Sequence, residues 1–225
     1  MYKHLKRIVD LLLALLALLL LTPLLIPITI GLLLTGEGYV WYFQERIGFR
    51  NNKFMIWKFA TMLKDSPNMK GGYLTTLKDP RITPMGGFLR KSKINELPQL
   101  INILKGEMSF VGARPVMEVS FRAYPSEIQE IIYNVKPGLT GLGSLIFRNE
   151  EALITTVKER GLDPIQFYRN EIYPYKGELE KYYQENYGFS TDLKIFFGTI
   201  LMVLFSNEKI PFLLFPNAPK KQFDL

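Results

Sequence analysis

"LLLALLALLLLTPLLIPITIGLLL", residues 11–34, is a run of 24 residues in which no side chain carries a charge. Because about 20 apolar residues span a bilayer as a helix, the length of this run predicts a single-pass membrane anchor. A cleaved signal peptide fits less well, since the run is long and no cleavage site of small residues follows it. The run therefore predicts a chain that stays associated with a membrane.

Pro23 and Pro27 interrupt this run near its middle. Each proline removes a backbone donor and clashes with the preceding turn, so each favours a bend. Residues 11–22 would form roughly 18 Å of helix, about half of a ~30 Å hydrocarbon core. The run therefore also predicts a re-entrant helix that bends at Thr22–Pro23 and leaves on the face it entered, with Thr22 helping to satisfy the freed carbonyls. The lengths alone leave the re-entrant helix and the straight span open.

The residues on either side of the run predict its orientation. Lys3, Lys6 and Arg7 precede it, and positive charge favours the cytoplasmic side of a membrane. The aromatic cluster "YVWYF", residues 39–43, follows the run. Such a cluster is typical of a belt at the membrane interface.

The composition limits the chemistry that the chain can perform. It has 225 residues, no cysteine and a single histidine, His4. These counts argue against a disulfide framework, cysteine-based sites, a histidine metal site and a Ser–His triad. The formal net charge of +7 suits nucleic acid, an anionic membrane surface or phosphorylated substrates.

The hydrophobic pattern divides the chain into three parts. Residues 1–37 are the expected re-entrant anchor, residues 38–206 an α/β (α+β) membrane-associated domain with amphipathic helices and a small sheet, and residues 207–225 an extended tail. Within the domain, alternating bulky residues predict two short strands joined by a turn from Gly48 to Asn52.

Other segments of the domain have weaker signals. Residues 65–87, rich in Gly and Pro, are expected to form a functional or mobile loop. Apolar residues at helical spacing predict a helix within residues 94–105 that ends at Gly106. The apolar stretch 192–205 is too short to span a membrane, so it is either a core helix or a helix in the membrane interface, and the anchor favours the interface. Further amphipathic helices are expected in residues 117–134 and 151–186.

"KINELPQL", residues 93–100, combines an amide and an acid ahead of a proline. Pro98 is tolerated only in the first turn of a helix, which places Asn95 and Glu96 at a helix N-terminus. There, Asn95 is a good N-cap and Glu96 complements the helix dipole, so a purely structural role is sufficient for both.

Cations surround this acid in the sequence, and they favour a functional role. A basic ring around an acid suits a phosphorylated substrate held by Arg together with a divalent metal, although solvated surface cations would give the same pattern. Nucleic-acid binding is less consistent, because no recognised module is present and the anchor argues against it. The cations are Arg81, Arg90, Lys91, Lys93 and Arg114.

Separated blocks of the chain, taken in order, resemble one protein family over nearly the full length. After the basic start and the apolar run come "FQERIG", "KF-TM", "KDPRIT-GGFLRK", "ELPQLINILKGEMS-VG-RP", "VKPGLTGL" and "DLKI--GTI". In this order the blocks are similar to those of the bacterial sugar transferases called monotopic phosphoglycosyl transferases.

The resemblance implies a re-entrant membrane helix with both ends cytoplasmic, at the cytoplasmic face of the bacterial inner membrane. It implies transfer of a sugar 1-phosphate from a UDP-sugar to polyprenyl (undecaprenyl) phosphate, with release of UMP and a requirement for Mg²⁺. This reaction is the first membrane step of glycan assembly, for exopolysaccharide, O-antigen or glycoprotein. The expected partners are therefore a UDP-sugar, polyprenyl phosphate and membrane lipid, with no nucleic acid, and a homo-oligomer is compatible with these.

The resemblance also assigns residues. In this family an Asp ahead of "ELPQL" attacks the β-phosphate and forms a covalent phosphosugar intermediate, and the following Glu completes the dyad. Asn95 and Glu96 occupy these two catalytic positions, and Glu96 is the expected metal ligand. Lys58, Arg90 and Arg114 match positions expected to bind phosphate.

Asn95 departs from the family pattern, because a carboxamide is a poor nucleophile and a weak metal ligand. Three possibilities remain open: a deliberate inactivating change, a natural subgroup in which Glu96 or the lipid phosphate attacks, or a non-catalytic scaffold in a glycan pathway. Ala60 and Ala113 also depart from the pattern, which usually has Arg and Pro there.

Overall fold

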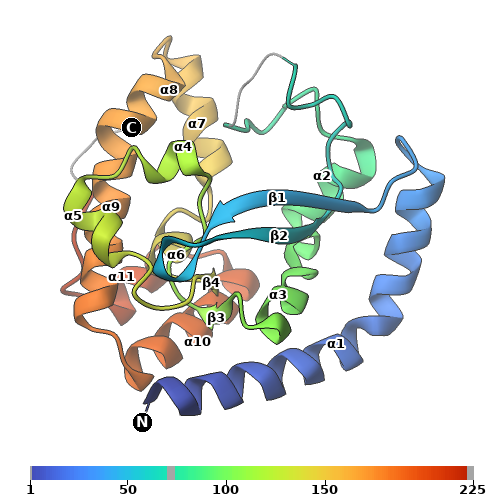
Figure 1. Ribbon diagram of the computed structural model, residues 1–225. Coiled ribbons are helices and arrows are strands. Elements are labelled where there is room, and N and C mark those ends of the chain that lie inside the picture. The colour runs from blue at the N-terminus through green and yellow to red at the C-terminus, as the bar shows by residue number, and fades with distance from the viewer. Residues whose placement is uncertain (1, 70–73, 222–225) are drawn as a thin grey trace.

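The computed structural model describes residues 2–69 and 74–221. Helices enclose two small sheets, and one long helix runs along the base of the molecule (Figure 1). The β1–β2 sheet is antiparallel and the β3–β4 sheet is parallel. This mixture agrees with the expected α/β (α+β) class.

In chain order the elements are α1 (Tyr2–Leu34), β1 (Trp41–Ile47), η1 (Phe49–Asn51), β2 (Lys53–Phe59), α2 (Pro84–Lys91), η2 (Ile94–Glu96), α3 (Gln99–Lys105), β3 (Ser109–Val111), α4 (Glu118–Phe121), α5 (Ser126–Ile131), β4 (Gly138–Thr140), α6 (Leu142–Ile146), α7 (Glu150–Glu159), α8 (Pro164–Phe167), η3 (Tyr168–Ile172), α9 (Tyr173–Glu185), α10 (Phe189–Phe205) and α11 (Ile210–Leu214).

The apolar run lies in a single helix of 33 residues, α1, which contains Pro23 and Pro27. Among the described residues, α1 is the helix that is long and apolar enough to cross a membrane. Figure 1 shows that α1 follows the lower edge of the domain and then turns upward. The expected break is therefore a bend in a continuous helix, and prolines are the usual cause of such bends.

Thr22 acts at this bend in a different way from the one expected. Its hydroxyl donates to the carbonyl of Leu18 at 2.7 Å, whereas Pro23 removes the donor that would reach the carbonyl of Leu19. Thr22 therefore does not satisfy the freed carbonyl. A Thr hydroxyl bonded four residues back favours bending by itself.

The two halves of α1 pack against different parts of the domain. Ala14 in the first half is buried against α3. Ile28 and Leu32 in the second half are buried with Phe59 of β2 and Leu89 of α2. The bend thus lets one helix cover two surfaces. The opposite side of α1 exposes large apolar side chains: Leu5, Ile8, Val9, Leu11, Leu12, Leu15, Leu16, Leu19, Leu20, Leu24, Ile26, Ile30, Leu33 and Leu34.

Asp192 of α10 joins the start of α1 to the domain. Its carboxylate, buried to 7% exposure, accepts hydrogen bonds from Tyr2, Lys6 and Tyr183. The Lys6 amine also donates to the carbonyl of Val111 at 2.7 Å. Lys6, expected among the basic residues that flank the anchor, is therefore engaged inside the protein.

Arg7 caps the C-terminal end of α3. Its guanidinium donates to the carbonyls of Ile103 at 2.6 Å and Leu104 at 2.9 Å, where a helix leaves carbonyls without partners. Gly106 follows in the left-handed conformation with φ +83°, so the expected C-cap is confirmed.

The expected hairpin is also confirmed, and its register places two cations on one face. β1 pairs with β2 from Trp41↔Phe59 to Ile47↔Lys53. Alternate residues of paired strands share a face, so Arg46 of β1 and Lys58 of β2 lie on the same side.

The C-terminal segment is not the extended arm that was expected. Residues 210–214 form α11, and Phe215 and Ala218 are buried in the main core. The Tyr175 hydroxyl donates to the carbonyl of Pro219 at 3.0 Å. That prediction is therefore wrong as far as Pro219, and residues 222–225 lie outside the described residues.

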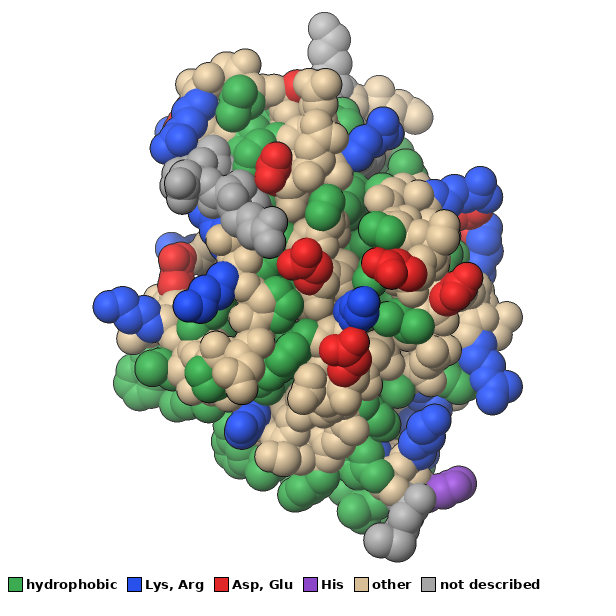
Figure 2. Space-filling model, turned by 90° about the vertical axis from the view of Figure 1, so that its left-hand side faces the viewer, with side chains coloured by type: hydrophobic (Ala, Val, Ile, Leu, Met, Phe, Trp, Pro, Cys, Tyr) green, Lys and Arg blue, Asp and Glu red, His purple; other side chains and the backbone are tan. Residues whose placement is uncertain are grey.

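α10 contains the predicted short apolar helix and buries only one side of it. Asp192, Ile195, Gly198 and Met202 face inward. Figure 2 shows hydrophobic side chains gathered along the lower edge of the molecule, with Asp and Glu side chains higher up. One side of α10 is therefore available to an apolar environment. Its exposed large side chains are Phe189, Leu193, Phe197, Ile200, Leu201, Val203, Leu204 and Phe205.

We expect Asp192→Ala to destabilise the protein, because it leaves the nearly buried Lys6 amine without its ion-pair partner. Breaking such a pair costs roughly 3–5 kcal/mol. Thermal unfolding in a single detergent measures the effect, with the exposed Glu178→Ala on α9 as the control. Equal melting temperatures for the two variants would contradict a role for Asp192 in joining α1 to the domain.

Candidate active site

Glu96 lies at the centre of an ion-pair cluster built from three segments. Lys58 of β2 donates to its Oε1 at 3.3 Å. Arg114, in the segment after β3, donates to both carboxylate oxygens, with 3.1 Å between Nη1 and Oε2. The structure thus brings together three residues that the sequence separates, and the bidentate geometry is the one that guanidinium and carboxylate groups favour.

The Lys58 and Glu96 side chains are each only 14% exposed, whereas the Arg114 side chain is 42% exposed. This partial burial influences the protonation states of the cluster. Burial alone would raise the pKa of Glu96, but Arg114 and Lys58 outweigh it and hold that pKa well below its usual value. The attraction of Glu96 in turn raises the pKa of Arg114. Burial lowers the pKa of Lys58 to about 7, despite the opposing effect of Glu96. Glu96 is therefore an ionised acid held by cations.

Asn95 does not cap a helix. It lies within the short turn η2, whose N-cap is Lys93 with φ 60°, and α3 begins three residues after Glu96 with Pro98 as its N-cap. Asn95 is buried, and its Oδ1 has no hydrogen-bond partner. The predicted capping role is wrong because Lys93 turns the chain before Asn95 is reached.

Unpaired polar atoms gather around this part of the chain. Of the seven buried side-chain polar atoms without a hydrogen-bond partner in the described residues, four belong to Arg46, Arg90, Asn95 and Gln99. Buried polar groups in native proteins normally have a partner, supplied by protein, water or ligand. The orphaned donors and the orphaned amide oxygen therefore indicate a site that is completed by a polar ligand.

Arg90 is positioned beside the cluster by α2. This helix begins at Pro84, inside the expected loop, and the Thr83 hydroxyl caps it by accepting from Gly86 N at 3.1 Å. The Arg90 guanidinium pairs with Glu151 at the start of α7, not with Glu96. That loop is thus shorter than predicted, and its residues 70–73 lie outside the described residues.

A second acid, Glu150, lies next to the cluster, and no pattern in the sequence pointed to it. Its carboxylate accepts from Lys176 at 2.8 Å and from the Tyr168 hydroxyl. Burial would raise the pKa of Glu150, but Lys176 and Tyr168 hold it below its usual value, with a smaller contribution from Arg114. Only the fold brings Glu150 near Arg114, so local spacing could not have identified it.

The donor set fits a magnesium ion only if substrate completes its coordination. Among residues 2–69 and 74–221 no three His, Cys, Asp or Glu side chains form a metal-binding group. Mg²⁺ commonly uses one or two protein ligands together with phosphate oxygens and water. Glu96 receives three donors, and a carboxylate has about four acceptor positions. One position on Glu96 and the unpaired Oδ1 of Asn95 are thus suitable ligands.

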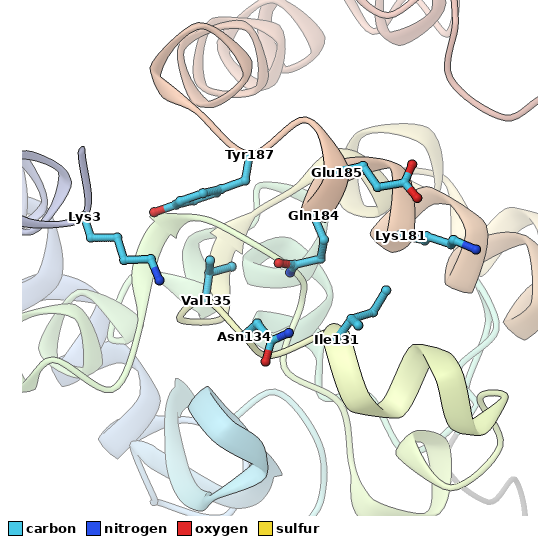
Figure 3. A pocket seen from close by; sticks show the side chains of 8 residues that line it. All are labelled: Lys3, Ile131, Asn134, Val135, Lys181, Gln184, Glu185 and Tyr187. Atoms are coloured by element: carbon cyan, nitrogen blue, oxygen red, sulfur yellow. The ribbon is translucent and has the colours of Figure 1, made fainter. Parts of the chain in front are cut away.

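A separate cavity of about 510 Å³ lies between the start of α1 and the ends of α5 and α9. Figure 3 shows Lys3 and Tyr187 on one side of it and Lys181 and Glu185 on the other. None of the residues assigned to catalysis or phosphate binding lines it, so the candidate site is the Glu96 cluster.

Comparison with known proteins matches residues 1–206 to the family model described as bacterial sugar transferase. The chain is 35% identical over 215 residues to the exopolysaccharide production protein ExoY of Sinorhizobium fredii, a match covering 89% of this chain and 86% of the relative. It is 34% identical over 216 residues to a UDP-galactose-lipid carrier transferase of Erwinia amylovora, covering 90% of this chain and 41% of that protein. A UDP-glucose:undecaprenyl-phosphate glucose-1-phosphate transferase of Escherichia coli is 41% identical over 139 residues, 61% of this chain and 30% of that protein. The chain therefore spans most of ExoY but less than half of the two transferases.

The lowered pKa of Lys58 predicts a pH-dependent stability. The unfolded amine keeps its proton up to about its usual pKa of 10.5, whereas the folded one loses it near 7. The free energy of unfolding therefore rises as the pH increases through this window, because the unfolded chain binds more protons. Lys58→Met should flatten that rise in melting temperature between about pH 7 and 10. The exposed Lys158→Met is the control, and a parallel pH dependence of all three proteins would contradict the assignment.

Proposed function

The chain belongs to the bacterial sugar transferase family, and from this premise we propose that it transfers a sugar 1-phosphate from a UDP-sugar to polyprenyl phosphate and releases UMP. One observation carries the proposal: an ionised Glu96 is held by Lys58 and Arg114 in a half-buried, cation-rich cluster, and the preceding residue, Asn95, has an unpaired side-chain oxygen. Cations that outnumber their carboxylate partners can bind the negatively charged oxygens of a diphosphate. The names of the relatives, which include transferases acting on UDP-sugars and undecaprenyl phosphate, support the same substrate classes.

With an amide at position 95, we assign the attack to the acceptor lipid itself. A phosphate oxygen of polyprenyl phosphate attacks the β-phosphorus of the UDP-sugar, a new P–O bond forms, and UMP leaves with the electrons of the broken P–O bond. Glu96 is poorly suited to be the nucleophile, because both of its oxygens accept hydrogen bonds from cations. It instead keeps Arg114 and Lys58 in place.

The cations supply most of the catalytic effect in this scheme. Fixed positive groups that face the negative charge developing on phosphate oxygens lower the barrier without reorganising. Arg114 binds Glu96 in the bidentate manner that a Lys cannot reproduce. Mg²⁺, when bound through Glu96, Asn95 and the diphosphate, would neutralise further negative charge.

Membrane association follows from the same proposal, since the acceptor is a lipid. The bend in α1 and the exposed apolar sides of α1 and α10 support a re-entrant anchor with the domain on the cytoplasmic face of the inner membrane. A non-catalytic scaffold in a glycan pathway is the second candidate, and Asn95 is the observation that favours it.

UMP release by three proteins separates these functions. We expect the chain itself to release UMP from a suitable UDP-sugar only when undecaprenyl phosphate and Mg²⁺ are present, with no labelled sugar phosphate left on the protein. Asn95→Asp introduces a nucleophile, so it should release about one UMP per chain without acceptor and retain the label. Glu96→Gln should slow the acceptor-dependent release of UMP roughly a hundredfold or more.

Three different results would each contradict direct attack by the lipid. A silent chain that Asn95→Asp activates would identify an inactivated transferase. Label retained by the unchanged chain, and lost in Glu96→Gln, would make Glu96 the nucleophile. No UMP from any of the three folded proteins, over a broad panel of UDP-sugars, would overturn the enzyme and leave the scaffold.

Single cysteines in this cysteine-free chain test the re-entrant anchor. We expect Lys3→Cys and Lys158→Cys both to resist an impermeant maleimide in intact spheroplasts and to react after permeabilisation, because both lie on the cytoplasmic side. Replacing Pro23 and Pro27 with Leu should straighten α1 and expose position 3 outside. External labelling of position 3 in the unchanged helix would establish a single-pass anchor.

A further inference from the structure

Arg46 is a cation that the proposed reaction has not yet used. It lies in β1 and belongs to the "FQERIG" block, on the same side of the hairpin as Lys58. Its Nη1 lies 3.4 Å from the carbonyl of Pro115, the residue directly after Arg114. The Arg46 guanidinium thus extends from the hairpin to the segment that carries Arg114.

Arg46 is half-buried, and its surroundings are unfavourable for a cation. Its hydrogen-bond acceptors are neutral, namely the side chain of Gln44 and the Pro115 carbonyl. None of the ion pairs found in the described residues involves Arg46. Its Nε is buried and has no acceptor. Burial and then the like charge of Arg114 lower the pKa of Arg46 to about 10, while Glu96 acts on it only weakly.

Hydrogen bonds fix the backbone that carries these two cations. The Tyr133 hydroxyl donates to the Arg114 carbonyl at 2.8 Å and accepts from Val116 N at 3.0 Å. Ile47 N donates to the Val116 carbonyl at 2.9 Å. Removing part of a cation from water without a counter-charge is costly, and a fold that enforces this beside a second cation is best accounted for by an anion that binds there.

We propose that Arg46 is a further phosphate-binding residue, which acts with Arg114 on a phosphate group of one of the two substrates and donates through its unpaired Nε. The inference rests on the proposed function for the identity of the substrates, but the anion site itself does not. A phosphate offers several strong acceptors and negative charge, the two properties that the neutral partners of Arg46 lack. The phosphate belongs either to the soluble UDP-sugar or to the lipid acceptor.

Binding and stability measurements on the full chain in lipid nanodiscs test this proposal without turnover. Arg46→Gln removes the charge, and Arg122→Gln is the matched control, because Arg122 follows α4 directly and its side chain is exposed. In phosphate-free buffer we expect Arg46→Gln to melt at or above the temperature of the unchanged chain, because one of two facing cations is gone. Its affinity for inorganic pyrophosphate should be roughly tenfold weaker or more, as expected for a lost charge-assisted hydrogen bond.

Two further ligands identify the source of the phosphate. A selective loss of UDP binding assigns Arg46 to the soluble donor, and a selective loss of undecaprenyl phosphate binding assigns it to the lipid acceptor. Either result supports the proposal. Unchanged affinity for all three ligands, together with a lower melting temperature, would make Arg46 a structural residue and overturn it.

Arg46→Lys covers the case in which Arg46→Gln does not fold. It keeps the charge but loses Nε and the planar fork, so we expect a severalfold weaker affinity for whichever ligand uses Arg46. Unchanged affinity of Arg46→Lys for every ligand would overturn the proposal, as would a failure of pyrophosphate, UDP and undecaprenyl phosphate all to bind the unchanged chain. UMP release decides the sugar transfer independently of either result.

Discussion

The candidate site depends on the side chain of Asn102, which links α3 to β2. This side chain is fully buried in α3, accepts from Trp57 N at 3.0 Å and donates to the Met55 carbonyl at 2.8 Å. A buried amide with its partners satisfied permits one register, so α3 cannot slide along β2. This register holds Glu96, just ahead of α3, against Lys58. Because α1 packs on α3 as well, the long apolar helix and the ion-pair cluster both contact one short helix.

Local patterns in the sequence predicted the elements that local chemistry determines. The hairpin followed from alternation and a turn, and the end of α3 followed from Gly106. The predictions were wrong where a contact or a backbone conformation has no signal in the neighbouring sequence. Three prolines after Ser206 suggested an extended arm, but Phe215 finds a place in the main core. Asn95 looked like a helix cap, but the left-handed Lys93 turns the chain earlier. The burial of Phe215 depends on residues distant in the sequence, and nothing in the sequence around Lys93 signals its left-handed conformation.

The candidate site was predictable only in part, for the same reason. Glu96 and Arg114 could be singled out as an acid and a nearby cation, but joining them to Lys58 required the order of blocks that resembles a family. Arg46 and Glu150 were not assigned, because each enters the cluster through tertiary packing. The fold also shows that the cluster has more cations than acids to pair with them, which the overall net charge could not reveal.

The attachment of α1 to the Asp192 carboxylate of α10 has a thermodynamic consequence. It holds the outward sides of both helices in a fixed relation, so their combined apolar surface exists only in the folded chain. An amphiphile that covers this surface as a unit therefore binds the native state in preference to the unfolded one, and mass action raises the free energy of unfolding accordingly. The stability of this protein is thus a joint property of the chain and the amphiphile around it, and two values measured in different detergents or lipids describe two different equilibria.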